Sequence, residues 1–288
     1  MSTHILENEH LRVTVADAGA ELISVYDKDR QTERIWTGDP AVWNRHAPIL
    51  FPFVGKVADG KYRIGATEYA MKTQHGFARD MDFACTEETA VSTAHCLAAS
   101  AATRAAYPYE FRLTVRHLLE GRQLRVEWTV ENRGDERMYY SIGGHPGFLL
   151  PDGIRKEDCF LLFPGADALS YISVNKGGYA LPEKKTLSLS GSAVRYQEDI
   201  PDTWIFENRQ VQQAGIATPD GQVYVLLSCE QFPTLAVWAN PKGPFICLEP
   251  WFGRTDDAGF SGAIDQKQDI QSLERGEKKE IAYTIQFC

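Results

Sequence analysis

Hydrophobic and polar residues alternate one by one along much of this chain. Within residues 122–131, Leu124, Val126, Trp128 and Val130 are hydrophobic, and the positions between and after them, 125–131, carry charged or hydroxyl side chains. Residues 111–118 alternate in the same way, and Gly121 lies in the short stretch between the two runs. A period of two is typical of strands with one buried face, so the pattern predicts an antiparallel β-hairpin here.

The same period predicts further strands from end to end, at residues 11–15, 21–26, 61–64, 223–228, 234–238, 245–249 and 280–287. Turn sequences such as Pro-Asp-Gly separate many of them. The helical signal is poor. The alanine-rich residues 87–106 could form a helix by propensity, or a strand and a short helical turn, and Tyr107-Pro108-Tyr109 would end either one.

The density of strands favours an all-β fold, a large antiparallel β-sandwich. The chain has 288 residues, a length that suggests two domains by size alone. No repeat or low-complexity linker divides it, and all-β chains of such length are often single domains. We therefore expect one domain over residues 1–288.

Composition and charge exclude several classes of protein. Hydrophobic residues are 43% and charged residues 24%, which is ordinary for a globular protein and argues against a disordered or fibrous chain. Lysine and arginine total 30 and aspartate and glutamate 39, a net charge of −9 that disfavours nucleic acid as a partner. A local basic pocket for a small anion remains open.

The cysteines and the N-terminus point to the cytoplasm. None of the six cysteines forms a C-x-x-C pair, so neither a zinc site nor a disulfide framework is expected. The first residues lack the basic and then apolar pattern of a secretory signal, and no run is long and apolar enough for a membrane span. The prediction is a cytoplasmic protein with reduced thiols, no membrane association and no metal.

Two histidines lie in segments suited to a site. His75 is followed by Gly76, which would allow close approach to the imidazole, and Arg79 could recognise a polar or anionic group. His145 follows Gly143-Gly144 and precedes Pro146-Gly147, which leaves little side-chain bulk around its ring. A loop histidine bonded to backbone is the alternative for His75.

Three further residues are candidates. Glu249 ends an apolar strand beside Pro250-Trp251, where burial could tune a carboxylate for general base work. The alternative is a salt bridge to Arg254 or another arginine. Asp202 follows a proline and could be only a turn former, and Arg45 could lie at a solvated loop end.

No metal-ligand spacing, nucleotide-binding glycine motif or G-x-S-x-G nucleophile motif is present in the sequence. What remains is acid–base chemistry by histidine and carboxylate in an aromatic cleft. Aromatic faces with a few convergent polar groups suit a sugar, which has both apolar C–H faces and hydroxyl groups.

Taken together, six segments resemble the aldose 1-epimerase (galactose mutarotase-like) family, in a LacX-like branch near the hexose-6-phosphate 1-epimerases. They occur in the family's order and span nearly the whole chain, at residues 45–52, 74–79, 107–111, 143–148, 202–204 and 248–253. The resemblance implies a large antiparallel β-sandwich with the sugar cleft on one concave sheet. It also implies a cofactor-independent isomerase of carbohydrate metabolism, a monomer or weak dimer, that interconverts sugar anomers.

The resemblance implies a role for each candidate residue. His145 would be the general acid at the ring oxygen, and Glu249 the general base at the anomeric hydroxyl. His75 would assist the acid or orient the sugar, and Asp202 would bind ring hydroxyls.

The segment around His75 resembles the phosphosugar branch rather than the simple mutarotases, which leaves the phosphorylation state of the substrate open. There Arg79, and with an alignment offset by one residue Arg45, would help to hold a phosphate, with Lys56 as a further candidate cation. Two other functions stay open: a sugar-binding or regulatory β-sandwich that does not catalyse, and a lyase or hydrolase on a similar sandwich.

Overall fold

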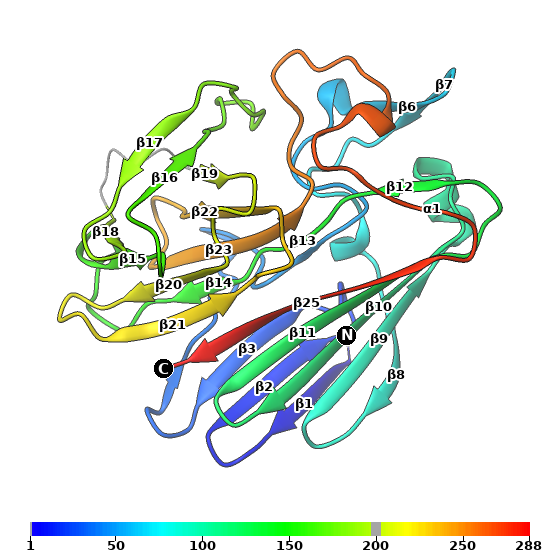
Figure 1. The fold of residues 1–288 in the computed structure, drawn as a ribbon. Helices are drawn as coiled ribbons and strands as arrows, with labels where there is room; N and C mark the ends of the chain where they lie inside the picture. The colour runs from blue at the N-terminus through cyan, green and yellow to red at the C-terminus, as the bar shows by residue number, and fades with distance from the viewer. Residues whose placement is uncertain (1, 197–202) are drawn as a thin grey trace.

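Antiparallel strands make up most of the structure, a computed structural model that describes residues 2–196 and 203–288 (Figure 1). The largest sheet has nine strands, in the order β18 (Ala193–Arg195), β15 (Phe160–Leu162), β20 (Gln213–Ala217), β21 (Val223–Ser228), β25 (Lys278–Phe287), β11 (Gln123–Asn132), β10 (Phe111–Glu120), β9 (Ser92–Ala98) and β8 (Ala84–Glu88). The predicted hairpin is part of this sheet, since β10 and β11 pair in unbroken register from Phe111↔Asn132 to Glu120↔Gln123.

A four-stranded sheet lies against part of the large one, and contains β1 (Thr3–Glu7), β2 (Leu11–Ala16), β3 (Leu22–Asp27) and β4 (Thr32–Glu33). Figure 1 shows β25, β11, β10, β9 and β8 over β1, β2 and β3. One cluster of buried side chains joins the facing sheets, among them Leu6, Val13, Val126 and the fully buried Trp128. Alternation therefore buries one face of each strand, and the prediction of an all-β antiparallel sandwich is confirmed.

A third sheet positions most of the site described below. Its order is β19 (Thr203–Phe206), β22 (Thr234–Trp238), β23 (Phe245–Phe252), β13 (Ile142–Gly144) and β5 (Ile49–Leu50), and β14 (Gly147–Leu149) also pairs with β23. Every residue of β23 is buried. A strand enclosed on both faces gives a rigid support for side chains that must keep a fixed geometry.

The remaining elements are short. Two-stranded sheets pair β6 (Lys61–Ile64) with β7 (Thr67–Ala70), β12 (Met138–Tyr140) with β24 (Gln271–Leu273), and β16 (Ala168–Tyr171) with β17 (Lys185–Ser188). Single 3₁₀ turns lie at η1 (Ala58–Gly60), η2 (Ala78–Asp80), η3 (Lys156–Asp158) and η4 (Ile264–Gln266). None of the helices in the described ranges has the length and apolar composition needed to span a bilayer.

The alanine-rich residues 87–106 are not one helix. They contain the end of β8, all of β9 and then α1 (Ala101–Ala106). Ser100 caps α1, because its side chain accepts from the Thr103 amide while the Thr103 hydroxyl accepts from the Ser100 amide. Tyr107 is extended and ends the helix, so the reading of a strand plus a short helical turn is the correct one.

Candidate active site

A cavity of about 440 Å³ opens beside β23, within the size range of small-molecule sites. Five of the six predicted site residues line it: Arg45, His75, Arg79, His145 and Glu249. The sixth, Asp202, lies outside the described residues. The structure therefore brings together side chains that are up to 204 positions apart in the sequence, from Arg45 to Glu249.

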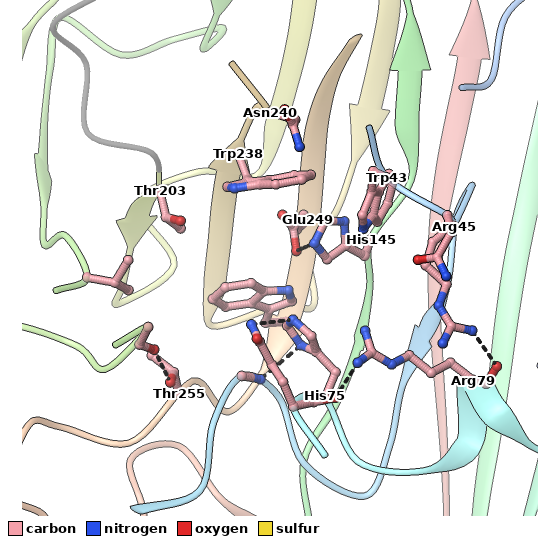
Figure 2. A pocket seen from close by; sticks show the side chains of 16 residues that line it. Trp43, Arg45, His75, Arg79, His145, Thr203, Trp238, Asn240, Glu249 and Thr255 are labelled. Carbon is pink, nitrogen blue, oxygen red and sulfur yellow. Dashed lines mark hydrogen bonds and ion pairs between the residues drawn. The ribbon is translucent and has the colours of Figure 1, made fainter. Parts of the chain in front are cut away.

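His145 and Glu249 form the centre of this cavity (Figure 2). Glu249 lies in β23, and His145 lies between β13 and β14, two short strands that both pair with β23. The break between the two strands leaves His145 next to the carboxylate, with 3.2 Å between its Nε2 and Oε2 of Glu249. Gly143 permits the pairing of β13 with β23, because a Cβ there would lie 2.5 Å from the Trp251 ring.

Burial controls the charges of this pair. Glu249 is 1% exposed and His145 is 7% exposed. Burial raises the pKa of Glu249 well above its ordinary value, and burial lowers the pKa of His145 to about 3. Both shifts favour a carboxylic acid beside a neutral imidazole over an ion pair. In that state the pair carries one transferable proton in total, on Glu249.

His75 is held in one tautomer. The backbone amide of Gly55 donates to its Nδ1 at 3.0 Å, so a neutral ring carries its proton on Nε2. The side-chain amide of Gln74 lies 3.0 Å from this Nε2 and can accept its proton only with the amide oxygen turned to the ring, because the amide nitrogen is itself a donor. Burial, together with His145 and Arg79, lowers the pKa of His75 well below its ordinary value. His75 is therefore a neutral hydrogen-bond donor, and its ring lies 5.6 Å from that of His145 between centroids.

The backbone at His75 and Gly76 is unusual, since both have positive φ angles, of 67° and 69°. This turn lets Phe77 and Ala78 donate to the carbonyl of Phe51. Only glycine fits at position 76, because a Cβ there would lie 2.3 Å from that same carbonyl oxygen.

The substitution Gly76→Ala should therefore lower the free energy of unfolding by about 3 kcal/mol, from both backbone strain and overpacking. Gly65→Ala is the matched control, since Gly65 also has a positive φ but a Cβ there meets nothing within 4 Å. It should lose only about 1 kcal/mol from strain. Urea unfolding measures both, and equal losses would show that the contact with Phe51 is unimportant.

Two arginines form one end of the cavity. Arg79 donates to the carbonyl of Gln74 at 2.6 Å, while Arg45 donates to the carbonyl of Arg79 and pairs with Asp80. Glu21 orders the loop after Arg45 by accepting from the amides of His46 and Ala47. Arg45 is therefore partly exposed but held by its carbonyl and carboxylate partners at the edge of the cavity.

The other predicted cation has a different place. Lys56 is not among the lining residues, and its ammonium lies 6.0 Å from the centroid of the Tyr179 ring. The alternative of a salt bridge between Glu249 and Arg254 is also wrong. Arg254 pairs instead with Glu207 at 2.7 Å and with Asp257 at 2.9 Å.

Several lining residues were missed by the sequence reading. The rings of Trp43 and Trp238 lie 4.9 and 5.4 Å from that of His145 between centroids. Their aromatic faces and nearby polar groups suit a sugar's C–H and hydroxyl surfaces. The other lining residues not singled out are Asn44, Gly55, Val174, Gly178, Thr203, Asn240 and Thr255. A signal existed for three of the missed residues, since Trp43-Asn44 directly precedes Arg45 and Trp238 ends a predicted strand.

Known proteins are similar to this chain over nearly its whole length. A family model described as aldose 1-epimerase matches residues 2–283. The plasmid-encoded protein LacX of Lactococcus lactis subsp. lactis is 29% identical over 285 residues, which cover 93% of each chain.

Solved structures are similar over their whole length. A galactose mutarotase-like protein from Lactobacillus casei ATCC 334 is 31% identical with a TM-score of 0.91, and the match covers 100% of both chains. A galactose mutarotase related enzyme from Lactobacillus acidophilus is 28% identical with a TM-score of 0.93, covering 100% of this chain and 97% of that one.

Proposed function

Because the chain belongs to the aldose 1-epimerase family, we propose that it interconverts the α and β anomers of a hexose or hexose phosphate by acid–base ring opening and closure. The observation that supports this most is the contact of 3.2 Å between His145 and Glu249 in an aromatic cavity. The proposal includes a cytoplasmic location, which suits the six free cysteines of the chain.

The pair can supply both proton transfers of ring opening. Ionised Glu249 takes the proton from the anomeric hydroxyl while protonated His145 gives a proton to the ring oxygen, and the bond from C1 to the ring oxygen breaks. The resulting aldehyde turns by half a rotation about its C1–C2 bond. Closure runs the same transfers backwards and forms the other anomer, so no cofactor is needed.

The proton count of the pair stays constant through this cycle. An ionised Glu249 with a protonated His145 has the same number of protons as a carboxylic acid with a neutral imidazole. Ring opening converts the first state into the second, and burial favours the second because it carries no charge. The cavity thus stabilises the protonation state that accompanies the open-chain aldehyde.

The remaining residues bind and orient the sugar in this proposal. His75 donates from Nε2 rather than acting as an acid, because it is neutral and its Nδ1 already accepts from Gly55. Asp202 binds ring hydroxyls, as the family resemblance implies. Arg79 and Arg45 supply positive charge at one end of the cavity, where a phosphate would lie.

The pH dependence of kcat/KM follows from the one-proton pair. We expect a broad plateau through neutral pH. Activity should fall in acid as the pair gains a second proton, since burial lowers the pKa of His145 to about 3, and in alkali as it loses its only proton, since burial raises the pKa of Glu249. NMR exchange rates across pH measure this. A single transition near the ordinary histidine pKa of 6.5 would contradict it.

The substitution Arg79→Ala tests phosphate recognition. Loss of a charge-assisted hydrogen bond should raise KM for a hexose 6-phosphate by about 10- to 100-fold more than for the free hexose. The ratio of the two effects matters, because Arg79 also holds the carbonyl of Gln74 beside His75. Lys56→Ala is the control, because Lys56 does not line the cavity. It should leave KM unchanged for both the hexose and the hexose 6-phosphate. Equal losses for both sugars in Arg79→Ala would argue against a phosphate at this end.

The direct test of the function is the exchange rate between anomers, followed by NMR for several hexoses, free and phosphorylated. The wild-type protein should accelerate at least one of them far beyond the double variant Glu249→Gln, His145→Ala. Binding of a sugar with no acceleration would instead indicate a non-catalytic sugar-binding protein.

A further inference from the structure

A second cluster of reactive side chains lies away from the active site, where the four-stranded sheet meets the edge of the nine-stranded sheet. His4 comes from β1, Cys85 from β8 and His95 from β9. One nitrogen or sulfur atom of each lies within 4.8 Å of the others. None of the three lines the sugar cavity.

The strand register explains how this cluster forms. Cys85 and His95 are directly opposite in the β8–β9 ladder, so their side chains share a face. A bulge at Thr86 then shifts the register, so that Glu88 rather than Glu87 lies opposite Thr93. A bulge re-aims side chains, and this one turns Glu88 to the face that carries Cys85 and His95.

Carboxylates surround the imidazole of His4. Its Nε2 lies 2.9 Å from Oδ1 of Asp17, and its Nδ1 lies 2.9 Å from Oε2 of Glu88. The same Asp17 oxygen is 3.4 Å from Nε2 of His95. These two carboxylates give this end of the cluster a negative charge that a bound cation would neutralise.

His95 is the unusual member of the cluster. Its side chain is 0% exposed. Among the described residues its Nδ1 has no hydrogen-bond partner, and its Nε2 has only the long 3.4 Å approach of Asp17. A buried nitrogen without a partner is costly, and a neutral imidazole is the form that binds metals.

We propose that His4, Cys85 and His95 bind a divalent transition-metal ion of the zinc type, with Asp17 or Glu88 as the fourth ligand. Two imidazoles, a thiolate and a carboxylate are the donors that Zn²⁺ takes in four-coordinate sites. Whichever nitrogen of His4 binds the ion, the other keeps a carboxylate, which orients the ring as outer-shell partners do.

The bound ion would tie three strands from two sheets together. β1 is an edge strand of its sheet, and β8 is an edge strand of the other. The partly exposed Cys85 and the 13% exposed side chain of His4 give the ion access from solvent. We infer a stabilising role, independent of the sugar chemistry. The irregular cysteine spacing led to the prediction of no zinc site. That prediction could not include this cluster, because spacing along the chain does not reveal ligands that meet across sheets.

Cobalt is the probe, because a cysteine thiolate bound to Co²⁺ gives a charge-transfer band and a tetrahedral site gives intense d–d bands. We expect one Co²⁺ per chain, displaced by Zn²⁺, with the charge-transfer band lost in Cys85→Ser. His4→Gln should weaken binding by at least about tenfold. Zinc at 100 times its Kd should raise Tm by about 5 °C in the wild-type protein and not in Cys85→Ser.

Two variants serve as controls. His10→Gln removes an exposed histidine that also pairs with a carboxylate, Asp29, and it should bind cobalt like the wild type. Cys247→Ala removes the thiol of another group of possible ligands, with His145 and Glu249 in the active site, and should keep the band. The proposal is overturned if cobalt gives no band, if Cys85→Ser retains it, or if Cys247→Ala abolishes it. None of these results depends on whether the protein acts on sugars.

Discussion

The substitution Glu249→Gln is expected to lower kcat for anomer interconversion by about 10³-fold, within the range for general acid–base catalysts. Glutamine has nearly the same shape as glutamate, so the packing in β23 should survive. Its amide cannot accept the proton of the anomeric hydroxyl, and ring opening then lacks its base. Because sugars also interconvert slowly in water alone, the measurement is NMR exchange at low temperature with the uncatalysed rate subtracted.

Glu207→Gln is the matched control for this experiment. Glu207 is also a buried carboxylate, but it pairs with Arg254 and does not line the cavity. Its loss should lower stability and leave kcat near the wild-type value. The assignment of Glu249 as the base fails if Glu249→Gln keeps kcat within tenfold of the wild type while circular dichroism shows the same fold.

The strands were predictable where one face is buried. The alternation in residues 122–131 located β11 to within one residue at each end, because burial of one face forces a period of two. β1 was missed, since it is an edge strand whose pattern of exposure does not alternate fully. The propensity of alanine for helices was overruled at Ala94 and Leu97, which are buried in the β9 ladder.

The active site was predictable only in part. Glycine and proline around His145 and the aromatic residues after Glu249 marked both as special, and the structure places them in contact. The partner of Arg254 was not predictable, because Glu207 reaches it from a distant part of the chain. The bulge in β8 was equally hidden, since no residue type requires it, yet it decides which face Glu88 occupies. The roles of the site residues stay predictions, as does the single domain.

The substitution His145→Gln is expected to lower kcat by about 10²- to 10³-fold. The glutamine amide can donate a hydrogen bond to the ring oxygen, but it cannot transfer a proton to it. The Trp43 and Trp238 rings beside His145 report on local packing, so tryptophan fluorescence gives an independent check of the site. A change in kcat accompanied by an altered emission spectrum would point to repacking rather than to loss of the acid.

The double variant Glu249→Gln, His145→Gln distinguishes a coupled pair from two independent catalysts. If the two groups acted independently, their losses would multiply to about 10⁵- to 10⁶-fold. We expect the double variant to be only slightly slower than Glu249→Gln. Each ring opening needs both transfers, one to Glu249 and one from His145, so the loss of either group already blocks this route. The same NMR exchange assay measures all four proteins. Losses that multiply would show that His145 and Glu249 contribute separately, which contradicts a pair that works with one proton in total.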